Sequence, residues 1–282
     1  MLRRFSRLRA LAVIATAAAL APAQVETLRP GFDLFTPDQD VQLGCDARGE
    51  IDAKLTRLRN GEIRGYLDDI GRRLARSPHA GTFPFTFTVV RDPKINAFSL
   101  PGGPVYINSG AMIACDNEAQ LAGVMAHEMS HVALRHGTSQ LSKQELIALP
   151  AMLASAAFGR DSIIGRLAQL GIGLGAGSVL LHYSRGNEAQ ADYNGAEIMA
   201  DAGYDPIEMA RFFEKLESKS HRQGALEQFL SDHPNPGNRV EAVKEEVRQM
   251  PRRDYQEDSP RFHRMRDLVV RLQGRPAVTP RG

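Results

Sequence analysis

Two histidines and a glutamate lie together in the segment HEMSH, at His127, Glu128 and His131. On an α-helix, residues four positions apart are rotated by only about 40°, so the imidazoles of His127 and His131 could reach one ion. Glu128 would then point to the side of that ion, where it could take a proton from an attacking water. This spacing is typical of peptidases that use zinc to activate water for peptide hydrolysis.

A catalytic zinc site usually has a third protein ligand, with a fourth position left for water. The metzincin pattern would place Gly at 134 and His at 137, but the chain has Leu134 and Gly137, which excludes that class. His136 comes five residues after His131, so on a continuous helix it faces away from the ion. We therefore assign His136 to packing or polar bonding.

Two acidic residues in the segment SRGNEAQAD, residues 184–192, are better candidates for the site. Glu188 lies near the start of an expected helix and could project toward the two histidines as the third ligand. Asp192 lies one turn further on the same face, where it could accept the outer N–H of a ligand histidine and fix its tautomer. On spacing alone, ordinary solvated helix charge is the simpler explanation of both acids.

The helix that must position HEMSH is indicated by its caps and its apolar residues. Asp116 or Asn117 can cap its start, and Gly137 is expected to end it. An apolar stripe runs along it, formed by Leu121, Val124, Met125 and Val132. A second amphipathic helix is expected over 61–76, where apolar residues recur at helical spacing.

A β section precedes the HEMSH helix. Alternation of apolar and polar residues predicts short strands over 83–90, 96–100 and 105–108, with a turn over 101–104. We read them as a small antiparallel sheet. The expected fold is therefore α+β and mainly helical, with a zincin-like HExxH helix packed on that sheet.

Both ends of the chain are predicted to lie outside the folded domain. Residues 1–23 combine four arginines, a charge-free run and the sequence Ala-Pro-Ala, the pattern of a cleaved secretory signal peptide. An uncleaved anchor is the alternative, although the run is shorter than the roughly 20 residues that span a bilayer. We expect a linker over 24–37, a zinc metallopeptidase domain over 38–250 and a weakly ordered tail over 251–282. The protein is thus expected to be exported to the periplasm, with membrane association left open.

The charge of the chain depends on this leader. The formal net charge is +2, but the first 23 residues hold four arginines and no acid, so the remainder carries −2. The basic character therefore belongs mainly to the export signal, and we expect no nucleic-acid partner.

Two features remain open at this level. Residues 146–181 contain two uncharged, glycine-containing runs, which fit either a pair of packed helices or a hairpin that touches a membrane as a peripheral contact; a true span is the less favoured reading. Cys45 and Cys115 could form a disulfide in an exported protein or remain free thiols.

Four motifs in this order resemble a known family: NAFSLPGG, HEMSHVALRH, SRGNEAQAD and SDHPNPGNR. Together they resemble the gluzincin metallopeptidases related to CAAX prenyl proteases and HtpX, and within them the periplasmic branch concerned with outer-membrane quality control. The resemblance covers roughly residues 38–250.

The resemblance implies one zinc ion held by His127, His131 and Glu188, with Glu128 as the catalytic base. It also implies that Asp192 supports a ligand from behind. The His-Pro segment and an arginine six residues later correspond to His233 and Arg239. The resemblance gives these two residues a role in binding the substrate backbone or the oxyanion, or gives His233 the role of capping the zinc in a closed state.

The expected function is a zinc-dependent endopeptidase that cleaves unfolded or misassembled polypeptides in the cell envelope. Its expected partners are polypeptide substrates, which the NAFSLPGG strand could bind by backbone hydrogen bonds. One alternative is a periplasmic chaperone or assembly factor that uses the same cleft without turnover. Another is a membrane-embedded peptidase that uses residues 146–181.

Overall fold

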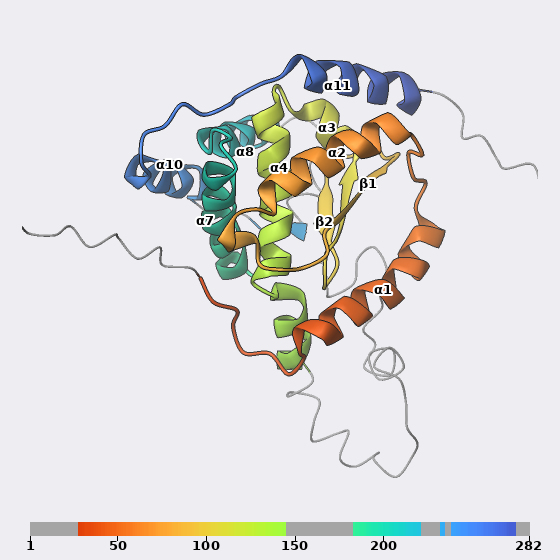
Figure 1. Ribbon diagram of the computed structural model, residues 1–282, viewed down its shortest axis with the longest axis vertical. Helices are drawn as coiled ribbons and strands as arrows, with labels where there is room; N and C mark the ends of the chain where they lie inside the picture. The colour runs from red at the N-terminus through yellow and green to blue at the C-terminus, as the bar shows by residue number, and fades with distance from the viewer. Residues whose placement is uncertain (1–27, 145–182, 221–231, 235–237, 275–282) are drawn as a thin grey trace, which may run out of the picture.

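A computed structural model describes residues 28–144, 183–220, 232–234 and 238–274. Its elements follow one another as α1 (Pro37–Lys54), α2 (Gly61–Leu74), η1 (Pro78–Ala80), β1 (Thr86–Val90), β2 (Ala97–Ser99), β3 (Pro104–Asn108), α3 (Ser109–Ala114), α4 (Glu118–Ala133), α7 (Arg185–Asp201), α8 (Ile207–Ser220), α10 (Arg239–Gln249) and α11 (Pro260–Gln273). The prediction of a mainly helical α+β fold is confirmed (Figure 1). The expected signal peptide and the segment 146–181 lie outside the described residues.

The strands form one three-stranded sheet in the order β1-β3-β2. β2 and β3 pair antiparallel, whereas β1 and β3 pair in parallel, with Thr86 opposite Pro104 and Val90 opposite Asn108. The prediction of an antiparallel sheet is therefore wrong for one of its two pairings. Alternation along a strand indicates which residues are buried but not which strands are neighbours, and here β3 lies between β1 and β2.

Hydrophobic side chains cover both faces of the sheet. On one face, Val105 and Ile107 of β3 join the main core, which also contains residues of α2, α4, α7, α8, α10 and α11. On the other face, Phe98 and Tyr106 stack with ring centroids 4.8 Å apart and pack with residues of α1. Successive side chains of a strand point to opposite faces, so the short β3 strand serves both cores.

α4, the helix that carries HEMSH, runs through the middle of the molecule between the sheet and α7 (Figure 1). Its start agrees with the prediction, because the side chain of Asn117 accepts a hydrogen bond from the Gln120 amide at 2.9 Å. Every residue from Glu118 to Val132 is buried. The expected apolar stripe therefore belongs to a helix that is surrounded by protein on all sides.

The C-terminal end of α4 differs from the prediction, which placed it at Gly137. The helix ends at Ala133, and Arg135 has a φ of 55° before a further helical segment over 136–144. This left-handed conformation is costly for a residue with a Cβ. The side chain of Arg135 compensates: its Nε donates to Asp40 at 2.6 Å, and its Nη2 donates to the Phe35 carbonyl at 2.6 Å. The chain therefore turns sharply just after HEMSH.

α7 packs along α4 and brings acidic side chains opposite the two histidines. The approach is close at Gly195, where an added Cβ would lie 3.3 Å from the backbone nitrogen of His127 and 2.9 Å from Met209. A capping box fixes the start of α7. Because α7 begins beside α4, Glu188 and Asp192 in its first two turns are directed at HEMSH.

The prediction of weak order after residue 250 is wrong for α11, which lies across the top of Figure 1. The helix has a Ser259 N-cap and buries Phe262, Met265 and Val269 against the core. The segment before it is tied to the start of α4, since Gln256 donates to the buried Glu118 carboxylate at 2.8 Å. Arginine and proline content indicated disorder, but the apolar residues at helical spacing decided the structure.

An acidic pair between α7 and α10 should make stability depend on pH. Burial and the neighbouring Glu197 raise the pKa of Glu246 to about 7. The unfolded chain ionises this group near pH 4.3. Glu246 therefore does not destabilise the folded protein below about pH 4. The destabilisation grows as the pH rises toward 7 and reaches its full size above pH 7. We expect Glu246→Gln to raise the melting temperature by a few degrees at pH 8 and to leave it unchanged near pH 4. Glu241→Gln, an exposed change on the same helix, serves as the control, and an equal gain at both pH values would contradict the assignment.

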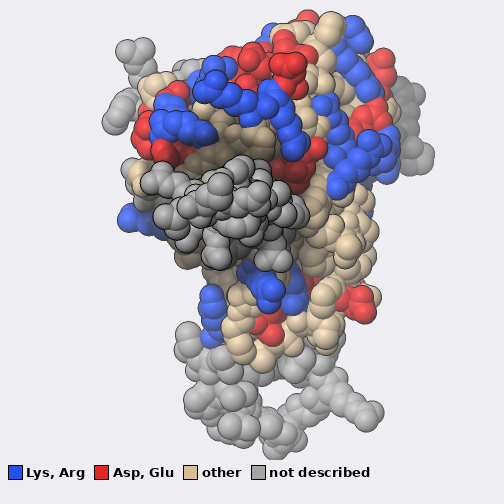
Figure 2. All heavy atoms as spheres, turned by 60° about the vertical axis from the view of Figure 1, so that its left-hand side comes forward, with Lys and Arg blue, Asp and Glu red and all other residues tan. Residues whose placement is uncertain are grey.

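Three remaining observations concern the surface and the cysteines. No helix within the described residues has the length and hydrophobicity needed to cross a membrane. Basic and acidic side chains lie side by side on the face shown in Figure 2. Cys45 is exposed and Cys115 is buried, and the two are not joined by a disulfide.

Candidate metal centre

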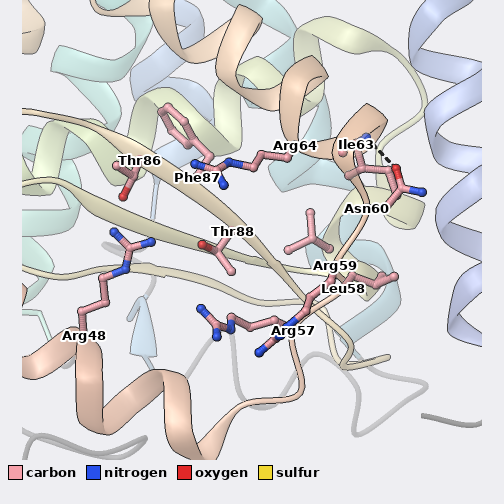
Figure 3. Close-up of a pocket in the computed structure, with 12 residues that line it drawn as sticks. Arg48, Arg57, Leu58, Arg59, Asn60, Ile63, Arg64, Thr86, Phe87 and Thr88 are labelled. Carbon is pink, nitrogen blue, oxygen red and sulfur yellow. Dashed lines mark hydrogen bonds between the residues drawn. The ribbon is translucent and has the colours of Figure 1, made fainter. Parts of the chain in front are cut away.

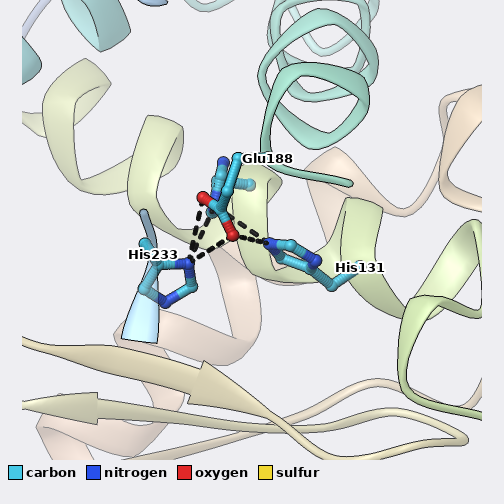
Figure 4. Close-up of side chains that lie close together, drawn as sticks. His131, Glu188 and His233 are labelled. Atoms are coloured by element: carbon cyan, nitrogen blue, oxygen red, sulfur yellow. Dashed lines mark hydrogen bonds and ion pairs between the residues drawn. The ribbon is translucent and has the colours of Figure 1, made fainter. Parts of the chain in front are cut away.

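Four side chains from three parts of the chain converge beside α4. His127 and His131 project from α4, Glu188 from the first turn of α7, and His233 from the short described stretch 232–234. One donor atom from each residue lies within 4.8 Å of the other three, and all four residues are buried. Figure 4 shows the Glu188 carboxylate between the rings of His131 and His233.

The distances within this cluster are those of atoms arranged around a common centre. His127 Nε2 lies 3.1 Å from His131 Nε2 and 3.3 Å from Glu188 Oε2. His131 Nε2 lies 3.4 Å from Glu188 Oε1. His233 Nδ1 lies 3.3 Å from His127 Nε2 and 3.1 Å from Glu188 Oε1. Nitrogen and oxygen lone pairs this close repel one another unless protons or a cation lie between them, so the cluster could hold a metal ion.

Asp192 lies behind His127, as predicted for a carboxylate that accepts the outer N–H of a ligand. Asp192 Oδ1 is 3.0 Å from His127 Nδ1. Arg239 fixes this carboxylate with two hydrogen bonds, from Nε to Oδ2 at 3.1 Å and from Nη2 to Oδ1 at 2.6 Å. With a metal ion at the centre, the remaining ring proton of His127 would lie on Nδ1, facing Asp192, and Nε2 would face the ion.

Arg239 is buried rather than open to a substrate. Its Nη2 is 3.6 Å from Glu188 Oε2, and its guanidinium lies 3.7 Å from the centre of the Phe213 ring. Only 2% of the residue is exposed. In this arrangement Arg239 orients Asp192 and Glu188, whereas the sequence resemblance gave it a direct contact with the substrate or the oxyanion.

His136 has a more specific place than the sequence indicated. Because the chain turns at Arg135, the His136 ring does not face away but meets the outer side of His131, with 2.9 Å between their Nδ1 atoms. His136 Nε2 lies 3.2 Å from Gln190 Oε1. Burial lowers the pKa of His136 to about 4, so the ring is neutral at pH 7. The amide oxygen then accepts the Nε2 proton, and His136 Nδ1 can accept the Nδ1 proton of His131.

This chain of hydrogen bonds fixes the tautomer of His131. With its proton on Nδ1, His131 presents a bare Nε2 to the cluster centre. Different groups therefore lie behind the two histidines of HEMSH, a carboxylate behind His127 and a neutral imidazole behind His131. The polar bonding proposed for His136 from the sequence is therefore present, and its partner is a candidate ligand.

Glu128 points into the same region from α4. Its Oε2 accepts a hydrogen bond from the Ser99 hydroxyl of β2 at 3.0 Å, and its Oε1 lies 3.4 Å from His233 Nε2. His233 Nε2 is also 3.2 Å from the Ala97 carbonyl. Burial raises the pKa of Glu128, and the nearby histidines oppose that shift. The edge strand β2 therefore borders the site, as expected for the NAFSLPGG segment.

When no cation is present, the pKa values of the residues in this cluster are shifted in different directions. Burial opposes protonation of His127, but the Asp192 and Glu188 carboxylates outweigh it and raise the pKa of the ring to about 10. Burial, together with neighbouring histidines, lowers the pKa of His131 well below its usual range despite the charge of Glu188. Burial also opposes ionisation of Glu188, yet the surrounding histidines hold its pKa well below its usual value. A metal ion at this position must therefore displace protons.

Residues 62–247 match the profile of Peptidase family M48. The chain belongs to this family. The resemblance to gluzincin peptidases and the prediction of a metalloendopeptidase are thereby confirmed. The matched region contains the whole cluster, and membership implies a metal cofactor.

The chain is also similar in sequence to several curated proteases. It is 34% identical over 232 residues to the putative beta-barrel assembly-enhancing protease of Vibrio cholerae, an alignment that covers 77% of this chain and 46% of that protein. Identity to the beta-barrel assembly-enhancing protease of Escherichia coli is 28%, with 75% and 44% covered. Identity to the mitochondrial metalloendopeptidase OMA1 of Saccharomyces cerevisiae is 35%, with 54% and 44% covered. The chain thus spans about half the length of the curated relatives it matches.

The M48 chain brings together all seven residues that the sequence singled out, which are His127, Glu128, His131, Glu188, Asp192, His233 and Arg239. Sequence reasoning missed two supporting contacts. The first is the chain of contacts that runs from Gln190 to His136 and from His136 to His131. The sequence hints at it only in that a polar Gln190 lies between two acids of one helix. The second is the hydroxyl of Ser99 on Glu128, which lies inside a recognised motif but has no distinctive spacing.

Proposed function

We propose that this protein is a zinc-dependent endopeptidase that cleaves unfolded or misassembled polypeptides in the cell envelope. The observation that carries the proposal is the convergence of His127, His131 and Glu188 beside Glu128, at the edge of β2. A metal ligand set, a carboxylate base and an edge strand are the three parts that hydrolysis of an extended peptide requires.

Zinc fits the donor set. Zinc bonds to histidine nitrogen and carboxylate oxygen are about 2.0–2.2 Å long, so the ligands of a tetrahedral site lie about 3.3–3.5 Å apart. His127 Nε2 lies 3.1 Å from His131 Nε2 and 3.3 Å from Glu188 Oε2, and His131 Nε2 lies 3.4 Å from the other oxygen, Glu188 Oε1, so the donor atoms are close to this spacing. Two imidazoles and one carboxylate form a ligand set found in catalytic zinc sites, and their outer hydrogen bonds leave the inner nitrogens bare. We therefore assign His127, His131 and Glu188 as the zinc ligands.

Zinc, when bound, would polarise the substrate carbonyl and lower the pKa of the attacking water. Glu128 would accept the proton of that water and pass it to the leaving amine. Burial raises the pKa of Glu128 toward the range in which a carboxylate can do both. Ser99 holds one oxygen of the base, which fixes the direction from which the other oxygen reaches the water.

His233 lies beside the three assigned ligands, where it could supply a fourth donor atom. Its Nδ1 lies 3.3 Å from His127 Nε2 and 3.1 Å from Glu188 Oε1, distances equal to those among the three assigned ligands. Catalytic zinc sites keep the fourth coordination position open for water or substrate, whereas a fourth protein ligand fills it. We therefore infer that this arrangement is a closed state, and that His233 must withdraw before a substrate carbonyl can enter. Of the roles given by the sequence resemblance, capping the metal agrees best with this position.

The substrate would lie along β2. This strand is at the edge of the sheet and borders the cluster, with the Ala97 carbonyl 3.2 Å from His233 Nε2. If His233 withdraws, that carbonyl is free to pair with an extended chain. Backbone pairing recognises an unfolded polypeptide with little dependence on side chains, which supports unfolded or misassembled proteins as substrates.

A location in the cell envelope is supported by two observations. The first 23 residues have the composition of a signal peptide, and the similar bacterial proteins are named for the assembly of β-barrels. We propose the periplasm as the compartment. Contact of residues 146–181 with a membrane surface remains part of the proposal.

Removing the imidazole nitrogens behind His131 should weaken the zinc site. We expect His136→Phe to lower zinc affinity about 10- to 100-fold, the usual effect of losing a partner that orients a metal ligand. Zinc titration against a chromogenic chelator measures this affinity. His263→Phe removes a histidine from α11, far from the cluster, and is the control. Unchanged affinity in His136→Phe would show that His131 does not depend on its neighbour.

The proposed function is tested by comparing the wild-type protein with and without bound zinc. The zinc-loaded protein should cleave reduced, unfolded polypeptides such as casein, and it should leave a folded and stable protein intact. A chelator should abolish cleavage, and added zinc should restore it. Cleavage that persists after zinc removal would reject the proposal.

A second candidate, the chaperone or assembly factor, is favoured by one specific observation, the position of His233 beside the three assigned ligands. A protein held permanently in this state would bind unfolded chains without cutting them. Suppression of aggregation of an unfolded protein, with no cleavage by the zinc-loaded wild-type protein, would support this function instead.

A further inference from the structure

A hollow of about 540 Å³ lies at the opposite edge of the sheet from the metal centre. It is lined by α1, the segment between α1 and α2, the start of α2 and the outer edge of β1. The order β1-β3-β2 puts two strand spacings between this edge and β2, so the hollow is separate from the proposed substrate cleft. Its size is within the range of about 300–1,000 Å³ that is usual for ligand sites.

Four arginines line this hollow, namely Arg48, Arg57, Arg59 and Arg64 (Figure 3). We call it the arginine groove. The acids that oppose them are few. Arg48 and Arg57 share Asp52, at 3.7 and 2.5 Å from one oxygen.

The guanidinium groups of Arg59 and Arg64 are the least neutralised by acidic side chains. Arg64 lies 3.7 Å from Asp68 with 75% of its side chain exposed. In the part of the chain that the structure describes, Arg59 forms no ion pair, and it is exposed. The groove therefore has an excess of positive charge.

The edge of β1 in this groove is only partly paired. Its far end is covered, because the Leu58 amide donates to the Val89 carbonyl at 2.8 Å. Thr86 pairs on the other side, since its amide donates to the Gly103 carbonyl at 3.2 Å. Residues of a strand alternate between its two edges, so the amide and carbonyl of Phe87 point to the same outer edge as those of Val89. At Phe87 that edge offers one donor and one acceptor to a further strand.

We propose that the arginine groove binds an extended acidic segment of a polypeptide, as a short strand added to β1 at Phe87. Backbone hydrogen bonds to the strand edge would supply the pairing. Guanidinium groups match carboxylates with two parallel hydrogen bonds, so Arg59 and Arg64 would select acidic side chains on either side of the added strand. A lipid headgroup could use the charges but not the strand edge, which favours a peptide.

Such a site would hold a client or partner protein while the metal centre stays free. Binding here adds to the effective concentration of that chain near β2 without any contact at the zinc ligands. The binding is separate from hydrolysis, so it can be measured without turnover.

The test uses the full chain and a fluorescein-labelled peptide in which glutamate and threonine alternate over nine residues. Fluorescence anisotropy measures its binding to wild type, to Arg59→Glu/Arg64→Glu and to Arg253→Glu/Arg264→Glu. The second pair is the matched control, because both residues are exposed, lie elsewhere on the surface and change the net charge equally. Arg59→Gln/Arg64→Gln is the milder version if the first pair fails to fold, as judged by its melting temperature.

We expect the groove variant to bind the peptide at least tenfold more weakly, and the control to change by less than twofold. A peptide with glutamine in place of glutamate, and one with alternate backbone amides methylated, should each lose at least tenfold. Equal weakening in both variants would overturn the site, and full binding of the methylated peptide would overturn the strand pairing. Phosphatidylglycerol vesicles form the last arm: if they, and not the peptide, depend on Arg59 and Arg64, the groove is a membrane contact and the proposal fails.

Discussion

Glu128→Gln is expected to lower the rate of peptide hydrolysis by at least about a thousandfold while the protein keeps its zinc. The amide preserves the shape of the side chain and its hydrogen bond with Ser99, but it cannot accept a proton from water. General acid–base catalysis contributes typically 10²–10⁴ to a rate, and Glu128 is assigned both the base and the acid step. Cleavage of casein by wild type and variant at equal zinc content measures the effect.

The control separates this chemical loss from a loss of structure. Zinc content and melting temperature should be the same in Glu128→Gln and wild type, because Glu128 is not one of the assigned ligands. Glu241→Gln, an exposed change on α10, should leave the rate unaltered. Cleavage by Glu128→Gln at the wild-type rate would remove Glu128 from the mechanism.

Glu188→Ala should lose most of its zinc, with affinity reduced more than about a hundredfold. The Glu188 carboxylate is the only assigned ligand with a negative charge, and its oxygens lie 3.3 and 3.4 Å from the two ligand nitrogens. Even residues that only orient a ligand cost 10- to 100-fold when they are removed, so a ligand itself should cost more. Elemental analysis after dialysis measures the bound metal.

Asp192→Asn is expected to lower zinc affinity less than Glu188→Ala does. It keeps the shape next to His127 but weakens the acceptor of its outer proton, so we expect an affinity loss within the 10- to 100-fold range. Zinc should also raise the melting temperature of wild type, and this shift should disappear in Glu188→Ala, since only the folded protein binds the metal. Full zinc retention in Glu188→Ala would reject it as a ligand.

The two variants together distinguish the parts of the site. Glu128→Gln should bind zinc and fail to cleave, whereas Glu188→Ala should fail at both. His233 fits neither pattern, because in the closed arrangement it contacts Glu128 and Glu188 alike. In the proposed closed state, His233 would complete the ligand set and keep the site inactive until it withdraws.

The sequence by itself determined the local chemistry. The spacing of His127 and His131 places both rings on one helix face wherever that helix lies, because helical rotation depends only on residue number. The Asn117 cap follows from local hydrogen bonding in the same way. The order of four motifs was enough to indicate the family, and with it Glu188, which spacing alone left as an ordinary surface acid.

The tertiary structure decided everything that depends on two segments meeting. Glu188 reaches the histidines because Gly195 lets α7 approach α4, and β1 pairs in parallel because β3 enters between β1 and β2. The turn at Arg135, held by Asp40 nearly a hundred residues earlier in the chain, moves His136 behind His131. Local sequence specifies rotation and capping, but the partner of a buried polar group depends on packing between distant segments, and that is set only when the chain is folded.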